Sequence, residues 1–210
     1  MSSDKSGSPP CGIYVRIDDF SNMLDVIGYV RKMAFAINRS SGYEKNMVVV
    51  ELAYTEEVAE RIVDIVPIIR DQGFVVIVSG VSDSMGADGV LVTSPDEANI
   101  TRDKLGDDAI IGVTCDDLDA AATAVETGVD YVVIPSDPIT ISKFSAKSDV
   151  LCVARGKSIT NKNCGVLSQA GANLVDVGDY IRNHKKDAMQ GTVNILHELD
   201  QAVKSMGKLN

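Results

Sequence analysis

The segment GVDYVVIPSDPITISK, residues 128–143, changes character in the middle. Its first half is a run of β-branched and aromatic residues, which indicates a buried strand over Tyr131–Pro135. The second half holds Thr140, Ser142 and Lys143 behind a proline and shows no helical period, which predicts a loop after the strand. The segment therefore predicts one strand and the connection that follows its carboxyl end.

The opening of this segment recurs twice elsewhere in the chain. Residues 86–90 read GADGV, residues 128–132 read GVDYV and residues 171–175 read GANLV. Each copy closes a helical pattern and opens a strand, and glycine is suited to the left-handed position after a last helical turn. Three copies of one helix-to-strand joint indicate a repeated architecture.

Short apolar runs and amphipathic stretches alternate along the rest of the chain, which is typical of an α/β fold. The eight predicted strands are Gly12–Ile17, Met47–Leu52, Phe74–Ser79, Gly89–Thr93, Ala109–Thr114, Tyr131–Pro135, Val150–Ala154 and Leu174–Val177. The predicted helices are Asn22–Ile37, Glu56–Ile69, Asp116–Glu126, Asn161–Gln169 and Thr192–Met206.

These elements predict a compact (β/α)₈ barrel, a TIM barrel, as a single domain over residues 12–206 behind a disordered tail, residues 1–11. Only about ten residues separate the third and fourth strands, so the third helix, around Ser82–Gly86, is expected to be shortened or irregular. A doubly wound sheet is the alternative, but it usually has a glycine-rich first turn, which Gly12–Asn22 lacks.

The bulk composition limits the partners. The chain has 210 residues, 45% of them hydrophobic, and a formal net charge of −10, which argues against nucleic acid or an anionic membrane as a partner. A local positive pocket would then hold a small anion, and a homodimer is left open. The N-terminus has no apolar stretch of a signal peptide, and we expect a cytoplasmic protein whose four cysteines are free thiols.

In a barrel the ligand site lies at the carboxyl ends of the strands. Two groups there look suited to an anion: ARGKSIT, residues 154–160, where Gly156 and Lys157 offer backbone N–H groups and charge, and the stretch that begins at Gly178. A solvated basic turn with Thr160 as a helix cap is an equally weighted alternative. Arg16 and Glu51 lie near the ends of adjacent strands, and we expect them to form an ion pair inside the barrel.

Several motifs, read together, resemble the thiamine-phosphate synthase and TenI-like family of small barrels over residues 12–204. The motifs are IIGVT at residues 110–114, GVDY at 128–131, TISK at 140–143 and ARGKSIT at 154–160. In that family the synthase joins hydroxymethylpyrimidine diphosphate to thiazole phosphate and releases pyrophosphate. The resemblance implies a transferase of thiamine biosynthesis whose partner is a phosphorylated small molecule.

The resemblance and the places of the residues in the barrel assign predicted roles to eight positions. Lys143 would contact the diphosphate as the catalytic residue, and Asp96 would be a ligand of Mg²⁺. Substrate would be bound by Thr114, Thr140, Ser142, Gly156, Gly178 and Arg16, the last replacing a cation that the family has elsewhere. The residues alone favour a surface lysine on a mobile loop at Lys143, and its place after a barrel strand then favours a functional role.

The sequence departs from the family on the diphosphate side. The strand-two motif Gln-Leu-Arg-Glu-Lys corresponds to ELAYT at residues 51–55, and the Asn-Asp pair after strand three corresponds to Ser79-Gly80. Because lost charge-assisted contacts cost a few kcal/mol each, these changes predict weakened synthase chemistry. The alternative function is a TenI-like barrel that binds a phosphorylated small molecule in a regulatory or other role.

Overall fold

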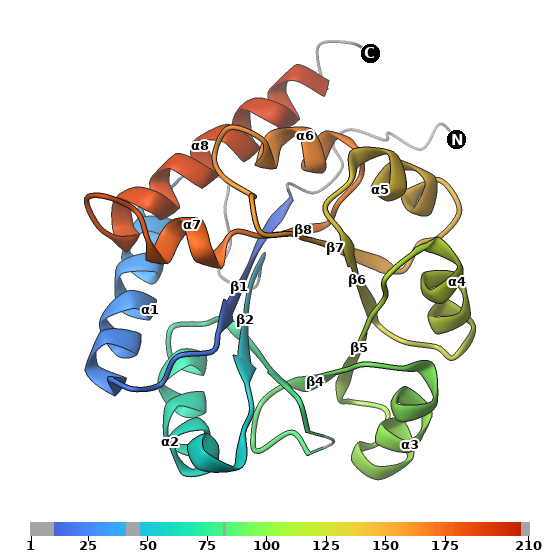
Figure 1. Ribbon diagram of the computed structural model, residues 1–210. Helices are drawn as coiled ribbons and strands as arrows, with labels where there is room; N and C mark the ends of the chain where they lie inside the picture. The colour runs from blue at the N-terminus through green and yellow to red at the C-terminus, as the bar shows by residue number, and fades with distance from the viewer. Residues whose placement is uncertain (1–10, 41–46, 82, 207–210) are drawn as a thin grey trace, which may run out of the picture.

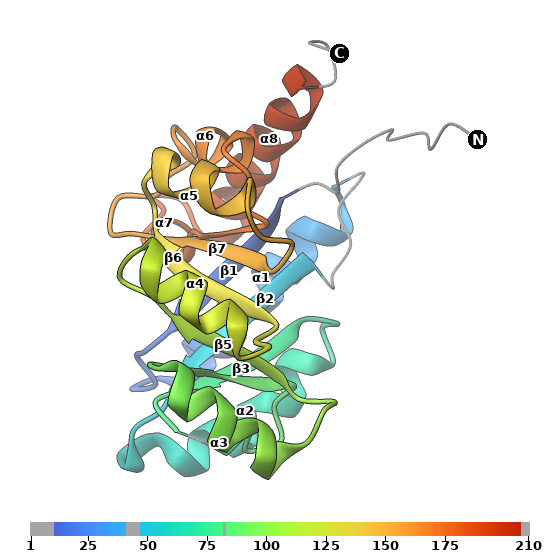
Figure 2. The same cartoon turned by 90° about the vertical axis from the view of Figure 1, so that its right-hand side faces the viewer.

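Eight parallel strands close into a barrel in the order β1-β2-β3-β4-β5-β6-β7-β8 in the computed structural model, which describes residues 11–40, 47–81 and 83–206. Figure 1 looks along the barrel, with the strands in the middle and the helices around them, and Figure 2 gives the view turned by 90°. The strands are β1 (Gly12–Ile17), β2 (Val48–Ala53), β3 (Val75–Ser79), β4 (Gly89–Val92), β5 (Ile110–Thr114), β6 (Tyr131–Pro135), β7 (Leu151–Arg155) and β8 (Leu174–Asp176).

Helices follow most of the strands. They are α1 (Met23–Asn38), α2 (Ala59–Arg70) preceded by the 3₁₀ turn η2 (Glu56–Val58), α3 (Pro95–Leu105), α4 (Leu118–Glu126), α5 (Pro138–Ser145), α6 (Cys164–Gln169), α7 (Gly178–Arg182) and α8 (Ala188–Met206). The predicted barrel is thereby confirmed, and the doubly wound alternative is excluded because β1 pairs with both β2 and β8.

The connection from β3 to β4 has the irregular form predicted for a shortened third helix. Its described residues, 80, 81 and 83–88, contain no helix. The chain turns through Met85, with φ of 51°, and Gly86, with φ of 83°. The helix α3 instead follows β4, where the sequence analysis expected none, and begins with the cap of the Ser94 hydroxyl on the Glu97 N–H.

The repeated helix-to-strand joint fixes the ends of three strands. Asp88, Asp130 and Asn173 occupy the third position of the three copies, and each side chain accepts a hydrogen bond of 2.8 Å from the N–H of the second residue of the preceding strand. In return, the backbone N–H of each joint residue donates a hydrogen bond of 2.9 Å to the backbone carbonyl of the strand residue that its side chain contacts. This two-way pairing locks β3, β5 and β7 to the joints that precede β4, β6 and β8.

The core has two parts. The larger one lies between the sheet and the helices, and it includes Cys11, which is 4% exposed although the sequence analysis placed it in the tail. The remaining tail, residues 1–10, lies outside the described residues. All four cysteines are free and buried. The smaller part fills the barrel interior with Tyr14, Ile77, Leu91, Tyr131, Val133 and Val153.

Candidate functional site

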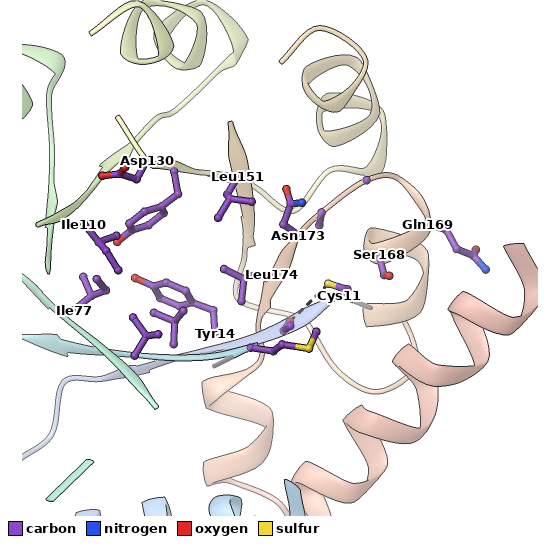
Figure 3. A pocket seen from close by; sticks show the side chains of 17 residues that line it. Cys11, Tyr14, Ile77, Ile110, Asp130, Leu151, Ser168, Gln169, Asn173 and Leu174 are labelled. Carbon is purple, nitrogen blue, oxygen red and sulfur yellow. Dashed lines mark hydrogen bonds between the residues drawn. The ribbon is translucent and has the colours of Figure 1, made fainter. Parts of the chain in front are cut away.

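The interior of the barrel opens at both ends. At the amino ends of the strands lies an apolar cavity of about 630 Å³, bounded by side chains such as Ile77, Ile110 and Leu174 (Figure 3). Tyr14 and Tyr131 close its inner end, with their ring centroids 6.4 Å apart. At the carboxyl ends of β1, β7 and β8 lies a smaller, charged cavity of about 340 Å³. Because substrates of such barrels bind at the carboxyl ends, the charged cavity is the candidate site.

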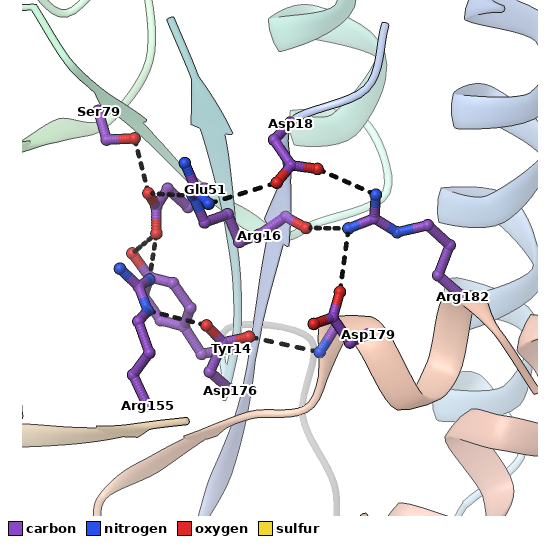
Figure 4. A network of polar contacts seen from close by, with 10 residues as sticks. Tyr14, Arg16, Asp18, Glu51, Ser79, Arg155, Asp176, Asp179 and Arg182 are labelled. Atoms are coloured by element: carbon purple, nitrogen blue, oxygen red, sulfur yellow. Dashed lines mark hydrogen bonds and ion pairs between the residues drawn. The ribbon is translucent and has the colours of Figure 1, made fainter. Parts of the chain in front are cut away.

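Four cationic side chains line the charged cavity, together with three carboxylates. The cations are Arg16, Arg155, Lys157 and Arg182, and the carboxylates are Asp18, Asp176 and Asp179. Figure 4 shows that the arginines and carboxylates form one connected network, which continues inward to Glu51. We call this network the mouth network; it comprises Tyr14, Arg16, Asp18, Glu51, Ser79, Arg155, Asp176, Asp179 and Arg182.

Glu51 is the centre of the mouth network and is 1% exposed. One carboxylate oxygen accepts from the Tyr14 hydroxyl at 2.9 Å and from the Arg155 guanidinium; the other accepts from the Ser79 hydroxyl at 2.6 Å and lies 3.3 Å from Arg16 Nε. The predicted ion pair between Arg16 and Glu51 is thus confirmed, and the register explains it, since the two residues are direct partners on β1 and β2.

Arg155 is held more firmly than the other arginines. Its Nε donates to Asp176 at 2.9 Å, its other end binds Glu51, and its guanidinium carbon lies 5.2 Å from the centre of the Tyr14 ring. Burial alone lowers the pKa of Arg155, but the neighbouring Glu51, Tyr14 and Asp176 outweigh it and hold that pKa above its ordinary value. Arg155 is therefore a fixed positive charge at the floor of the mouth.

Burial also raises the pKa of Asp176 and Tyr14, two acidic groups that contact Arg155. The pKa of Asp176 is raised because the carboxyl is buried, and the pairing with Arg155 offsets this only in part. The pKa of the Tyr14 phenol is raised by burial as well, so Tyr14 stays a neutral donor to Glu51 at physiological pH.

The structure brings together three of the predicted site residues. Arg16 and Gly156 line the charged cavity, and Gly178 packs so closely against β1 that an added Cβ would lie 3.0 Å from the Arg16 nitrogen. Gly156 has a similar reason to be glycine, because the Ser136 hydroxyl occupies the space of a Cβ. Thr114 ends β5 at the same face of the barrel and is half-buried, but it does not line this cavity.

The TISK segment is not the predicted loop. Residues 138–145 form the helix α5, because the Asp137 carboxylate caps it by accepting from the Thr140 N–H at 2.8 Å and Pro138 is pre-organised for a first helical position. The Thr140 hydroxyl donates to the same carboxylate at 2.7 Å. Ser142 and Lys143 are exposed on this helix, Lys143 in its last turn. Their roles in binding and catalysis stay predictions of the resemblance.

The donor set does not fit the Mg²⁺ that the resemblance implies. Asp96 is an exposed residue in the first turn of α3. Within residues 11–40, 47–81 and 83–206, no three His, Cys, Asp or Glu side chains are grouped so that they could hold a metal ion. The acids of the mouth are instead paired with arginines.

The sequence analysis missed two members of the mouth network that matter for its charge. Asp176 was read as part of a buried strand, although an acid in an otherwise apolar run is itself a signal of a partnered charge. Arg182 lies in α7, a five-residue helix too short for a periodic pattern.

The described residues form a small (β/α)₈ barrel with a charged cavity at the ends of β1, β7 and β8, the face at which ligand sites of this fold class lie. The model of one family, described as thiamine monophosphate synthase, matches residues 44–163. The chain belongs to this family.

One curated protein and several solved structures are similar to this chain. A thiamine-phosphate synthase of Rhodospirillum centenum is 35% identical over 114 residues, which are 47% of this chain and 55% of the relative, so the chain spans about half the length of the curated relative it matches. The solved thiamine phosphate pyrophosphorylase of Pyrococcus furiosus has a TM-score of 0.73 at 18% identity, over 91% of this chain and 96% of its own. The orotidine 5′-phosphate decarboxylase of Pyrococcus horikoshii OT3 has a TM-score of 0.69 at 17% identity, over 90% and 99%. The likeness to these two structures shows the fold.

None of the helices in the described part of the chain has the length and apolar character to span a membrane.

Proposed function

We propose that the chain is a thiamine-phosphate synthase-like transferase that joins hydroxymethylpyrimidine diphosphate to thiazole phosphate at the charged mouth of the barrel. Membership of the family and the cavity of about 340 Å³ with its four cations support this proposal. The phosphorylated ligand and a cytoplasmic location are parts of the proposal, whereas the Mg²⁺ implied by the family is left out of it because the acids of the mouth are paired with arginines.

The residues at the mouth can serve such a transfer in two ways. In this proposal the backbone N–H groups at Gly156, after β7, and Gly178, after β8, bind a phosphate in the cavity, and the exposed Lys157 adds a positive charge beside Gly156. Arg155 is a fixed guanidinium, so it needs no reorganisation to stabilise negative charge that develops on a leaving group. Tyr14 and Ser79 hold Glu51, which in turn orients Arg155.

The experiment mixes the purified protein at high concentration with both substrates and measures thiamine phosphate by mass spectrometry, with MgCl₂ and with EDTA. We expect product, and we expect the Lys143→Ala variant to lose at least about tenfold in rate if Lys143 contacts the diphosphate as the resemblance implies. Lys147→Ala is the matched control, since Lys147 is an exposed lysine just beyond the same helix. Absence of product at enzyme concentrations equal to substrate would overturn the proposed activity.

A second candidate is a TenI-like barrel that binds a phosphorylated molecule without this chemistry. One observation favours it: the Glu51 carboxylate, which stands where the family motif has glutamine, already accepts from three donors, is paired with Arg16 and fixes Arg155. This candidate predicts that thiazole phosphate raises the melting temperature without turnover, and that Lys157→Ala reduces the shift while Lys162→Ala does not. A flat response to thiazole phosphate would exclude it.

A further inference from the structure

Asp18 joins two arginines at the outer part of the mouth network. Its two carboxylate oxygens lie 3.3 Å from Arg16 Nη1 and 3.1 Å from Arg182 Nη1 (Figure 4). All three side chains line the cavity of about 340 Å³. A single exposed carboxylate therefore sits between two guanidinium groups, at a place where an anion from solution could also sit.

The two arginines would keep their positions without Asp18. Arg182 also donates from Nη2 to the Arg16 carbonyl at 2.9 Å, and Arg16 Nε lies 3.3 Å from the buried Glu51 carboxylate. The pair is thus preorganised by contacts that an entering anion need not break. Preorganised guanidinium groups bind phosphate oxygens through charge-assisted hydrogen bonds, often two at a time.

Asp18 is held less firmly than the buried acids of the network. Its side chain is 48% exposed, against 2% for Glu51 and 13% for Asp176. Ion pairs between exposed side chains contribute little to stability, so moving Asp18 into solvent costs little. Asp179 is a weaker neighbour of the same arginine, at 3.7 Å from Arg182 Nη2 and 76% exposed.

We propose that a phosphate group of the ligand binds between Arg16 and Arg182 in the place of the Asp18 carboxylate, that it needs no metal ion there, and that Asp18 is a built-in competitor for this subsite. The inference rests on the proposed function for its ligand class, a phosphate ester. Arg16, Asp18 and Arg182 lie outside residues 44–163, the part matched by the family model, so the family match says nothing about them.

Isothermal titration with inorganic phosphate in the presence of EDTA tests the inference on the intact chain. We expect Asp18→Asn to bind phosphate about tenfold more tightly than the original protein, which corresponds to about 1.4 kcal/mol. Asp18→Ala should give a gain of the same sign, and Asp179→Asn a smaller one, because Asp179 is farther from Arg182. Asp64→Asn is the charge-matched control on the exposed side of α2 and should change the affinity less than twofold.

The double variant Asp18→Asn/Arg182→Ala shows whether the gain depends on the subsite. If the inference holds, the gain of Asp18→Asn is lost in the double variant, while circular dichroism shows both to be folded. Three results would each overturn the inference. Phosphate binding in Asp18→Asn and Asp18→Ala could be equal to or weaker than that of the original protein, the gain in affinity could persist without Arg182, or it could require MgCl₂ in place of EDTA.

The two proposals can fail separately. Product formation from the two thiamine precursors with no effect of Asp18 on phosphate binding would remove the subsite and keep the activity. Tighter phosphate binding in Asp18→Asn without any product would keep the subsite and remove the synthase activity.

Discussion

The buried carboxylate of Glu51 gives the sharpest test of how the mouth network is held. The substitution Glu51→Gln keeps the shape of the side chain but replaces one carboxylate oxygen by an NH₂ group. That NH₂ would face donors, since one oxygen of Glu51 accepts from Tyr14 and Arg155, and the other accepts from Ser79 and is paired with the Arg16 guanidinium. It would also leave Arg155, which is 25% exposed, with Asp176 as its one strong carboxylate partner.

The size of the effect follows from these contacts. Removing one partner of a buried ion pair costs about 3–5 kcal/mol, and the remaining pairing with Asp176 favours the lower end, about 3 kcal/mol. Tyr14→Phe removes one neutral donor at 2.9 Å and should cost about 1 kcal/mol. Glu57→Gln, an exposed residue of the turn η2, is the control and should stay within about 0.5 kcal/mol.

Urea unfolding followed by circular dichroism measures these differences. With a slope of about 3 kcal/mol per M, a loss of about 3 kcal/mol lowers the midpoint of Glu51→Gln by about 1 M. A midpoint within about 0.2 M of the original protein, at an unchanged slope, would refute the reasoning, since Glu51 would then carry no buried charge pair of consequence.

Further predictions concern the packing and the buried thiols. Gly112→Ala should destabilise the protein by about 1–3 kcal/mol in thermal unfolding, because its Cβ would overlap the Tyr131 ring. Gly28→Ala in α1 should stabilise it by about 0.5–1 kcal/mol, because a Cβ there meets nothing within 4 Å. Equal effects of the two substitutions would contradict the packing. Native thiols should react with Ellman's reagent at pH 8 far more slowly than unfolded ones, because burial raises the pKa of all four thiols. The pKa is raised to about 12 for Cys11 and Cys152 and to about 11 for Cys115 and Cys164. Since unfolded thiols ionise near a pKa of about 8.5, the free energy of unfolding should also fall as the pH rises from about 8.5 toward 11, and a flat profile there would argue against burial of the thiols.

The barrel was predictable because its signals are local and repeated. The β-branched runs place β1 and β6 at their observed bounds, Gly12–Ile17 and Tyr131–Pro135, and both ends of every other strand within one residue of the observed ends. The three glycine joints predict three strand starts, and all three glycines have positive φ. The joints also bind the preceding strands through the side chains of Asp88, Asp130 and Asn173. The sequence did not predict this pairing, because it depends on contacts across the sheet.

Three helices, α3, α5 and α7, were missed for physical reasons, and α7 has only five residues, too few for a periodic pattern. The α3 sequence PDEANITRDKL has few apolar residues, since only Ala98 and Thr101 are buried, so periodicity gives almost no signal. The α5 segment is short, and its two buried apolar residues, Ile141 and Phe144, are too few to show a period. Its start was nevertheless visible in Asp137-Pro138, which is a capping residue followed by the residue favoured at the first helical position.

The site was only partly predictable from the sequence. Arg16 with Glu51 followed from their places near the ends of adjacent strands, and Gly156 from its place after β7. The contribution of Arg182 could not be foreseen, because it reaches Asp18 across 164 positions of the chain. The mouth network arises where β1 closes onto β8, a contact that only barrel closure creates.

The claim that the charged mouth is the ligand site can be tested directly by NMR. In a titration of ¹⁵N-labelled protein with thiazole phosphate, the amide signals of Gly156, Lys157 and Gly178 should shift most. Largest shifts at Ile110, Leu174 and other residues of the apolar cavity at the opposite end, or no shifts at millimolar ligand, would contradict the account.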